Sequence, residues 1–593
     1  MSICRNSGTI SADDKTVTVK GWVQEIRNLG GISFVILRDA SGTIQVTLPK
    51  KKICPELYRE LTTLPRESVV AVTGDVKASD QTELGVEIIP ASFELYSKAE
   101  VPLPMGVIDK VNVEMDTRLN NRFMDLRRPE IRAVFELKSM MIELLNEAMV
   151  SNGFSQVFTP KVVVFGAEGG ATLFKVDYFG NDAYLAQSPQ LYKQMLMVSG
   201  FDRYFQLARC YRDEDARGDR QPEFTQIDIE MSFVGREDVL ALAEGLMAHV
   251  FKKALNVELP SKFRRLSYEE AMESYGTDKP DLRFDLTLKD FSPWALAGDF
   301  QAFKEALSAG GAVKALVVPG KIGDRAVEYS RKQIEELEAH AKIYKARGLA
   351  WMRVGEGSTL EGGVSKFFAS QAEGIASGLG AGPGDLVLLL ADGKRKVANT
   401  ALGAVRSKLG RDLGLCDPGP GGSPKFEFVH IVDFPLFEFD EEAGRWEAAH
   451  HMFSFPQEKY HELLEKDPGA VKGDLYDIVL NGYELASGSI RIHDPELQKR
   501  IFKVVGFDPV EAESKFGFLT EAFKYGAPPH GGIAFGFDRL AMIMAGEASI
   551  KEVIAFPKNS FAEGLMDDSP NAVSPEQVKE LHLKIEEPPD NSK

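Results

Sequence analysis

The stretch RYFQLARCYRDEDARGDRQPEFTQIDIEMSF, residues 203–233, decides the fold. Apolar and polar residues alternate toward both of its ends, and a period of two sends alternate side chains to opposite faces of a sheet. A run of mixed charges separates the two ends. We therefore expect two strands joined by a charged loop. The second strand places Gln226, Asp228 and Glu230 together on the face opposite its apolar residues.

Two further polar segments lie far along the chain from this hairpin. The stretch NGYELASGSIRIHD (481–494) carries Glu484 and Arg491, and GGIAFGFDRLAMIMAG (531–546) places glycines before Arg539. Glycine permits close backbone approach, and arginine offers a planar fork that suits phosphate. An isolated hairpin of this kind is more simply interpreted as a solvent-facing sheet. The unmatched acids and the two other segments favour a site for a charged ligand.

The composition is typical of a globular protein. Of 593 residues, 44% are hydrophobic and 27% are charged, which at this length predicts three or four domains. The sequence has neither an apolar run of the length that spans a membrane, about eighteen residues, nor an apolar signal core at the N-terminus. The four cysteines form no CxxC pair, which favours the reducing cytoplasm and argues against a zinc ribbon. The net charge of −18 argues against non-specific coating of nucleic acid, although local patches can still bind RNA.

The pattern along the chain predicts an α+β protein of several domains. Residues 1–104 contain five strand patterns with a helical piece after the third, which matches a small Greek-key barrel of the OB type. Residues 131–290 and 421–560 mix strands and helices, and the insertion 291–420, rich in glycine and alanine, separates them. The remaining segments are a linker or hinge and a partly disordered C-terminal extension, at 105–130 and 561–593.

These motifs resemble those of a known family. The hairpin and the G-F-D-R turn before a helix are similar to motifs two and three of the class II aminoacyl-tRNA synthetases. The hairpin, QSPQLYKQ (187–194) and APPHGGIAFGFDRL (527–540) specifically resemble aspartyl-tRNA synthetases. The stretch VFTP, ending at Pro160, lies where motif one would be. The resemblance covers nearly the whole chain, and the insertion is similar to the GAD domain of the bacterial enzymes.

The resemblance implies a fold, a reaction and a set of partners. The fold is an antiparallel sheet flanked by helices, preceded by an anticodon-binding OB barrel and interrupted by an α+β domain. The reaction converts L-aspartate and ATP to aspartyl-adenylate and pyrophosphate, and then passes the aspartyl group to the 3′ end of tRNA(Asp). The implied protein is a cytoplasmic homodimer that binds neither membrane nor DNA.

The resemblance also assigns residues to ATP. Arg212 holds the α-phosphate and the substrate carboxylate, Arg539 holds the γ-phosphate, and these two are the expected catalytic residues. The other expected ATP contacts are Asp213, Glu214, Gln221, Glu484, Gly536, Phe537 and Asp538. Asp477 and Glu484 are the expected Mg²⁺ ligands, because hard carboxylate and phosphate oxygens are what Mg²⁺ prefers.

A further set is assigned to the amino acid: Glu168, Gln190, Lys193, Arg212, Asp228, His450 and Arg491. Arg491 and Lys193 match the pair that binds the side-chain carboxylate, and asparagine would leave a buried cation unpaired. Glu168, Gln190 and Asp228 are placed for the α-ammonium group. Without the resemblance, His450 and its neighbour would be interpreted as a structural pair, and Lys193 as part of a solvated helix face.

In the barrel, Arg27, Phe34 and Gln45 are the expected anticodon contacts, because exposed aromatic residues on an OB face stack unpaired bases. Pattern alone slightly favours Phe34 as a core residue, and the resemblance reverses that interpretation. Leu29, in the RNLGG turn, resembles the residue of enzymes specific for tRNA(Asp), whereas relaxed enzymes often carry histidine there.

The sequence departs from the common bacterial pattern at FGAEGGATLFK and at ELASGSIRIHD, which look like archaeal-type aspartyl enzymes. The main alternative is a non-discriminating enzyme that charges both tRNA(Asp) and tRNA(Asn). A non-catalytic RNA-binding paralogue is disfavoured by Arg212, Glu484, Arg491 and Arg539. An asparaginyl enzyme is disfavoured by RIHD and the insertion, and an ammonia-dependent asparagine synthetase would need neither barrel nor insertion.

Overall fold

The structure, a computed structural model, describes residues 3–109, 112–164, 166, 173–416, 424–571 and 574–584. It divides into two compact units, one of Met1–Arg132 with Gly564–Lys593 and one of Ala133–Glu563. Among the described residues, no helix combines the length and the apolar character needed to cross a bilayer.

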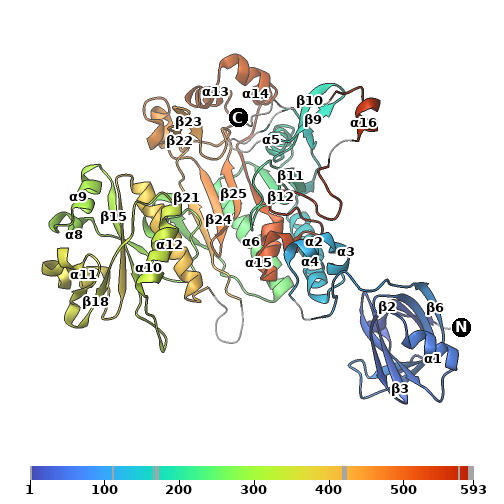
Figure 1. Ribbon diagram of the computed structural model, residues 1–593. Helices are drawn as coiled ribbons and strands as arrows, with labels where there is room; N and C mark the ends of the chain where they lie inside the picture. The colour runs from blue at the N-terminus through green and yellow to red at the C-terminus, as the bar shows by residue number, and fades with distance from the viewer. Residues whose placement is uncertain are drawn as a thin grey trace. The chain divides into compact units, whose positions relative to one another are not determined.

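The first unit contains a closed barrel of five long strands, β2–β6 in Figure 1, as predicted. The strands are β2 (Thr16–Leu29), β3 (Ile32–Asp39), β4 (Gly42–Pro49), β5 (Val69–Ala78) and β6 (Val86–Ser97). Helix α1 (Pro55–Thr62) lies between β4 and β5, and the short β1 (Ile3–Cys4) pairs with β2. Antiparallel pairing of β2 with β5 and parallel pairing of β4 with β6 close the barrel around a core of valine, isoleucine and leucine.

The segment 105–130, expected to be a linker, contains the helices α2 (Met115–Asn120) and α3 (Arg122–Asp125), and α4 (Pro129–Ser151) begins within it. Asp125 is fully buried and accepts hydrogen bonds from Arg118, at 2.9 Å, and from Arg122. Charged residues of this segment therefore pair with one another and order this part of the chain. In the C-terminal extension the structure describes α16 (Pro575–Glu580).

The second unit is built on a large, mostly antiparallel sheet, which confirms the expected architecture. In spatial order its strands are β13 (Arg264–Ser267), β21 (Phe428–Val432), β24 (Leu475–Leu480), β25 (Tyr483–Ile490), β26 (His530–Gly536), β12 (Glu223–Ser232), β11 (Arg203–Tyr211) and β7 (Ser155–Gln156). The two end pairs, β13 with β21 and β7 with β11, are parallel, and all the others are antiparallel.

Helices cover one face of this sheet. Helices α4, α6 (Arg236–Leu255) and α15 (Phe537–Ala545) supply apolar residues to a core that also contains Ile227, Ile229 and Met231 of β12. The alternation in the quoted stretch therefore places its apolar residues in the core, as predicted, and frees the opposite face of β12 for a site. Helices near the other face are α5 (Gln190–Val198), α13 (Pro495–Val504) and α14 (Pro509–Phe523), which share a smaller core.

Smaller elements complete the part of this unit that surrounds the large sheet. A three-stranded sheet is formed by β8 (Val162–Val163), β9 (Lys175–Tyr178) and β10 (Asn181–Leu185), and a hairpin by β22 (Phe437–Asp440) and β23 (Arg445–Ala448). Helix α7 (Tyr268–Tyr275) leads toward the insertion.

The insertion has its own antiparallel sheet with helices on both faces. In spatial order its strands are β14 (Leu288–Asp290), β15 (Ala312–Val318), β20 (Leu386–Asp392), β18 (Ala350–Val354) and β19 (Leu360–Glu361). One face packs on α10 (Arg331–Ile343) and α12 (Arg395–Asp412). The other packs on α8 (Ser292–Ala297), α9 (Gln301–Ser308) and α11 (Ala372–Leu379). A two-stranded ribbon is formed by β16 (Lys321–Ile322) and β17 (Arg325–Ala326).

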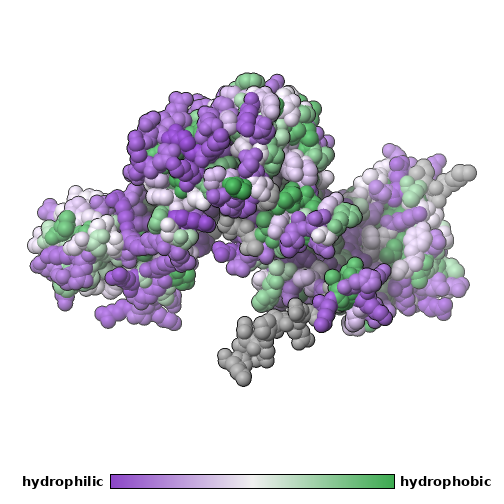
Figure 2. Space-filling view, turned by 90° about the horizontal axis from the view of Figure 1, so that it is seen from above, coloured by the Kyte–Doolittle hydropathy of each residue, from purple (hydrophilic) through white to green (hydrophobic). Residues whose placement is uncertain are grey.

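Hydrophilic residues cover much of the face that Figure 2 shows, and hydrophobic residues lie among them in patches. In the second unit the exposed apolar residues include Met140, Ile142 and Val150 of α4, and Phe158, which follows β7.

Candidate active site

A cavity of about 440 Å³ opens on the face of the large sheet opposite the core formed by α4, α6 and α15. Strand β12 contributes Gln226 and Asp228, and β11 pairs with it in register. The neighbouring strands β24, β25 and β26 contribute Asp477, Glu484 and Ala534, so the cavity combines segments that are about 250 and 300 residues away in the sequence. The three segments singled out in the sequence therefore meet at one site.

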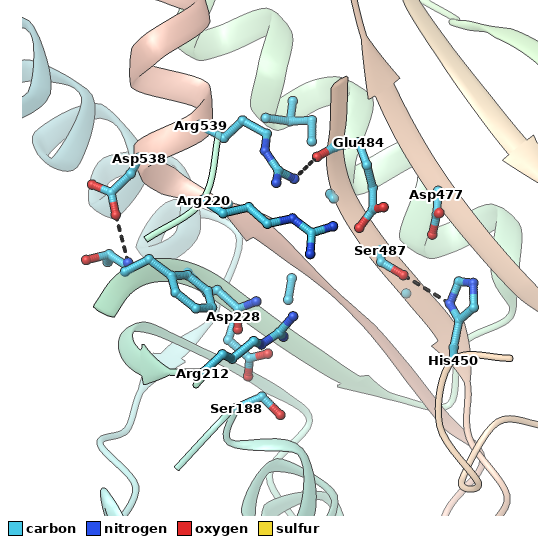
Figure 3. Close-up of a pocket in the computed structure, with 18 of the residues that line it drawn as sticks. Ser188, Arg212, Arg220, Asp228, His450, Asp477, Glu484, Ser487, Asp538 and Arg539 are labelled. Atoms are coloured by element: carbon cyan, nitrogen blue, oxygen red, sulfur yellow. Dashed lines mark hydrogen bonds between the residues drawn. The ribbon is translucent and has the colours of Figure 1, made fainter. Parts of the chain in front are cut away.

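The cavity is lined by charges of both signs. Its cations are Lys193, Arg212, Arg220, Lys279, Arg491 and Arg539, and its carboxylates are Glu214, Asp219, Asp228, Asp278, Asp477, Glu484 and Asp538. In Figure 3 the guanidinium groups of Arg212, Arg220 and Arg539 point into the cavity from one side, and Glu484 and Asp477 lie on the other. Such a site suits a ligand that carries several negative charges and a positive one.

The floor of the cavity contains a buried network of ion pairs. Lys193 Nζ lies 2.7 Å from Asp228 Oδ1 and 3.2 Å from Glu230 Oε2. Arg491 donates through Nε and Nη2 to the two carboxylate oxygens of Glu230, at 2.9 and 3.2 Å. The side chains of Lys193 and Arg491 are only 3% and 2% exposed. A bidentate pair away from water holds its geometry far better than a surface pair.

The two acids of this network differ in their pKa. Burial alone would raise the pKa of Glu230, but the cations of Arg491 and Lys193 outweigh it and lower the pKa. At Asp228 the effect of burial is larger than that of the nearby Lys193 cation, so the pKa of Asp228 is raised. Within the described part of the chain, Asp228 Oδ2 is buried without a hydrogen-bond partner. A buried acceptor of this kind favours a ligand that donates hydrogen bonds.

Strand β26 passes directly against this network. A Cβ atom on Gly532 would lie 2.0 Å from Glu230 Oε2 and 2.1 Å from the Ile229 carbonyl oxygen, so no other residue fits there. The glycines of the GGIAFGFDR segment were expected to permit close backbone approach. At Gly532 that approach is made toward the acid that orients Arg491.

His451 is a site residue that the sequence analysis did not assign. Arg491 Nη1 lies 2.6 Å from His451 Nε2, and because arginine only donates hydrogen bonds, Nε2 accepts and the imidazole is neutral. Burial and then the Arg491 cation lower the pKa of His451 well below its usual range. The neighbouring His450 lines the cavity, with Nδ1 3.1 Å from Ser487 Oγ.

Asp477 and Glu484 lie together at the far side of the cavity. Burial, and then the Glu484 carboxylate, raise the pKa of Asp477 well above its usual range, and Asp477 Oδ1 has no hydrogen-bond partner within the described residues. Lys279 lies 2.6 Å from Glu484 Oε2 and holds the pKa of Glu484 low against the effect of burial.

This pair fits a divalent cation that shares its other ligands with phosphate. Both groups are hard oxygen donors, and one of them lacks a partner. In the part of the chain that the structure describes, no group of three or more histidine, cysteine, aspartate or glutamate side chains is arranged to hold a metal. The two carboxylates therefore offer only part of a coordination shell.

The predicted arginines take distinct positions. Arg539 donates through Nη1 to the main-chain carbonyl of Glu484, and its Nη2 lies 3.2 Å from Asp219 Oδ2. Arg212 lies over the ring of Phe224, with 5.3 Å between the guanidinium carbon and the ring centroid. Arg220 pairs with Glu214 at 2.9 Å.

Several predicted ATP residues have structural partners. Gln221 exchanges hydrogen bonds with the main chain of Lys558, at 2.8 and 3.1 Å, although it also borders the cavity. Asp538 accepts hydrogen bonds from Lys138 Nζ, at 2.7 Å, and from the Thr225 amide, at 2.8 Å.

Other predicted residues are not brought to the cavity. Phe537 packs into the hydrophobic core and Asp213 is solvent-exposed, and neither lines the cavity. Gln190 does line it. Glu168, predicted to contact aspartate, lies outside the described residues.

The residues predicted to contact tRNA lie in the first unit, on the outer surface of the barrel. Arg27 pairs in register with Phe34 across β2 and β3, and Gln45 pairs with Ile36 across β3 and β4. Phe34 alternates with the buried Ser33 and is only half-buried, so it is not a core residue. Leu29, at the end of β2, is 65% exposed.

Comparisons with known proteins agree with this geometry. A family described as tRNA synthetases class II (D, K and N) matches residues 114–560, and an OB-fold nucleic acid binding domain matches residues 17–96.

Two curated relatives and one solved structure are informative. The chain is 56% identical to an aspartate–tRNA(Asp/Asn) ligase of Treponema denticola, over 97% of each chain. It is 44% identical to an aspartate–tRNA ligase of Bacillus licheniformis, also over 97% of each. Its fold resembles an asparaginyl-tRNA synthetase from Pyrococcus horikoshii complexed with asparaginyl-adenylate, with a TM-score of 0.57, 19% identity, and coverage of 91% of this chain and 94% of that one.

The lowered pKa of His451 generates a prediction for stability against pH. A histidine whose pKa is lower in the folded state stabilises that state fully above the unfolded pKa, about 6.5, and loses this contribution as pH falls. Between pH 7.5 and pH 5.5 we expect the free energy of unfolding to fall more in the native protein than in His451→Gln. The difference should reach up to about 1.4 kcal/mol per pH unit.

Scanning calorimetry at the two pH values measures this effect as a smaller shift in Tm for the variant than for the native protein. Titrating groups far from His451 contribute equally in both proteins, so the comparison cancels their contribution to the difference. An equal shift in the two proteins would show that His451 is not held neutral.

Proposed function

The chain belongs to the class II tRNA synthetases of the D, K and N group, and from this premise we propose that it is an aspartate–tRNA ligase. It activates L-aspartate with ATP to form aspartyl-adenylate and pyrophosphate, and then transfers the aspartyl group to the 3′ end of tRNA. The observation that carries the proposal is the buried pair of cations, Arg491 and Lys193, at the floor of a cavity lined with arginines.

Hydrogen-bond counting supports a role for these cations in binding the side chain of aspartate. Arginine has five N–H groups, and the contacts of Arg491 with Glu230, His451 and Ser489 use four of them. Lysine has three, of which one donates to Asp228, while Glu230 lies 3.2 Å away as an ion-pair partner. At least one donor therefore remains on each residue, which suits the two oxygens of one carboxylate. Asparagine would place an amide N–H₂ against one of these donors, so the site favours aspartate.

The α-ammonium group of the substrate finds acceptors on the same floor. Asp228 Oδ2 is buried without a partner within the described residues, and Gln190 lines the same cavity. An ammonium group would satisfy that oxygen and restore the charge balance that a bound carboxylate disturbs.

The ATP half of the site has little covalent chemistry to perform, because the attacking carboxylate comes from the substrate. Arg212 neutralises the α-phosphate where charge develops, and Arg539 holds the far phosphate. Glu214 and Gly536 border the cavity as adenosine contacts. Asp477 and Glu484 would hold Mg²⁺, which supplies charge neutralisation to the phosphates when bound.

The partners follow from the family. The outer barrel surface with Arg27, Phe34 and Gln45 would stack and bind anticodon bases. Exposed apolar residues on α4 and near β7, including Met140 and Phe158, support the predicted homodimer, since patches of this kind mark interfaces. The cytoplasmic location stays a prediction.

The experiment that tests the activity is aspartate-dependent exchange of pyrophosphate into ATP. We expect the native protein to catalyse exchange with L-aspartate and not with L-asparagine. Arg491→Leu removes two hydrogen bonds from buried Glu230 and one from the substrate, at a cost of about 3–5 kcal/mol, so exchange falls at least about a hundredfold.

ATP binding by Arg491→Leu, measured by calorimetry, remains close to native because the ATP half is untouched. Arg500→Leu is the matched control, since Arg500 makes a two-point pair with Glu465 at the surface. Loss of ATP binding in Arg491→Leu, or equal losses in both variants, would contradict the assignment.

A second candidate concerns the range of tRNAs. Relatives at 56%, 47% and 46% identity are named aspartate–tRNA(Asp/Asn) ligases, which favours charging of both tRNA(Asp) and tRNA(Asn). Leu29 instead favours an enzyme specific for tRNA(Asp), and relatives at 42% and 44% identity are named aspartate–tRNA ligases. The exposed position of Leu29 at the end of β2 suits either role.

Aminoacylation of purified tRNA(Asp) and tRNA(Asn) in parallel distinguishes the two candidates. If Leu29 sets specificity, kcat/KM for tRNA(Asp) exceeds that for tRNA(Asn) by at least tenfold, and Leu29→His narrows the difference. Equal charging of both by the native protein would contradict the role of Leu29 and establish the non-discriminating enzyme.

A further inference from the structure

Lys279 lines the active-site cavity although nothing in the sequence motifs drew attention to it. Its Nζ lies 2.6 Å from Glu484 Oε2. Its side chain is 34% exposed and that of Glu484 is 32% exposed, so the pair is open to the cavity and to ions in solvent. Arg539, the other cation near Glu484, contacts only its main-chain carbonyl oxygen.

Lys279 is surrounded by carboxylates. Besides its pair with Glu484, Asp278 and Asp477 also line the cavity. Lys279 thus faces the same two carboxylates that fit a divalent cation, and its charge is the positive charge nearest to the Glu484 carboxylate in the described structure.

Lys279 lies in the segment 276–283, and the insertion contacts the first end of this segment. Gly276 ends α7 with φ +70°, and a Cβ atom on it would lie 2.1 Å from the carbonyl oxygen of Asn399 on α12. Gly403, one turn further along α12, also comes close to this turn, with 2.5 Å from its Cβ position to the Tyr275 carbonyl oxygen and 2.8 Å to Gly276 Cα. The insertion helix therefore packs backbone to backbone against the start of the segment.

The other end of the segment is also fixed by the insertion. Arg406 of α12 is fully buried and donates hydrogen bonds to the carbonyl oxygens of Asp281 and Phe284, at 2.8 and 3.0 Å. Arg283 pairs with Asp281 and donates to the carbonyl oxygen of Cys416, beyond the end of α12. Residues 276–283 are thus held at both ends, which keeps Lys279 beside the cavity.

We propose that Lys279 is the resident counter-cation of the Glu484 carboxylate and occupies the place that a divalent cation takes when it binds with ATP. The inference rests on the proposed function. Two cations cannot share one carboxylate without repelling each other, so the ammonium group withdraws when the metal–nucleotide complex enters. While it is in place, Lys279 weakens the binding of free divalent ions, and the site favours a metal that arrives with phosphates.

Binding of Mn²⁺ alone, followed by electron paramagnetic resonance with full-length protein and no nucleotide, tests this role. Lys279→Met removes the charge and keeps the length of the side chain. We expect it to bind Mn²⁺ about fivefold more tightly than the native protein, as loss of a partly exposed ion-pair partner predicts. Lys279→Arg keeps the charge and should remain within about twofold of native.

Lys472→Met is the matched control, because Lys472 is 35% exposed and lies 3.6 Å from Glu269, outside the active-site cavity. It should bind Mn²⁺ like the native protein. Unchanged, weaker or undetectable Mn²⁺ binding by Lys279→Met would overturn the proposal, as would equal tightening in Lys472→Met. Aspartate-dependent exchange by the native protein tests the proposed function separately, because its failure would leave the order of Mn²⁺ affinities intact.

Discussion

The buried carboxylate of Glu230 is the constraint on which the rest of the site depends. It accepts a two-point pair from Arg491 and a third contact from Lys193, and all three side chains are almost completely removed from water. A charge buried in this way tolerates no missing partner, since losing one costs about 3–5 kcal/mol. The protein therefore keeps two cations in fixed orientations at the floor of a cavity, with at least one donor of each left for a ligand. A substrate carboxylate meets donors that are already positioned, so binding loses little side-chain conformational entropy.

The sheet supplies this arrangement because antiparallel register brings distant segments together. Glu230 is on β12, Arg491 follows β25, and β26 runs between these two strands. Gly532 of β26 has no side chain, which leaves room for the Glu230 carboxylate to pass across the strand to Arg491. Lys193 comes from α5, which packs near the same face. The proposed ATP half of the cavity uses the same strands, so one sheet positions both halves of the proposed site.

The alternation of polar and apolar residues along the sequence predicted those parts of the structure that are β-strands with one buried face. The polar face of β12 and the strands of the barrel follow from residues repeated every second position, and glycines before Arg539 indicated close approach. Residues whose role depends on tertiary partners were not predictable in the same way. Phe537 follows a glycine turn that suggested a ligand contact, but it is the first residue of a helix whose apolar face is buried. Asp538 lies in the same turn, yet Lys138, 400 residues away in the sequence, occupies its carboxylate. Lys279 and His451 lacked any local signal, because only the fold brings them to Glu484 and Arg491.

The central claim is that the donors left over on Arg491 and Lys193 receive the side-chain carboxylate of aspartate while Glu230 keeps its pairs. A crystal structure with a non-hydrolysable sulfamoyl analogue of aspartyl-adenylate measures this directly. The account predicts carboxylate oxygens of the analogue within hydrogen-bond distance of Arg491 Nη2 and Lys193 Nζ, with the Glu230–Arg491 contacts unchanged. A carboxylate bound elsewhere in the cavity, or a Glu230–Arg491 pair broken to admit it, would contradict the account.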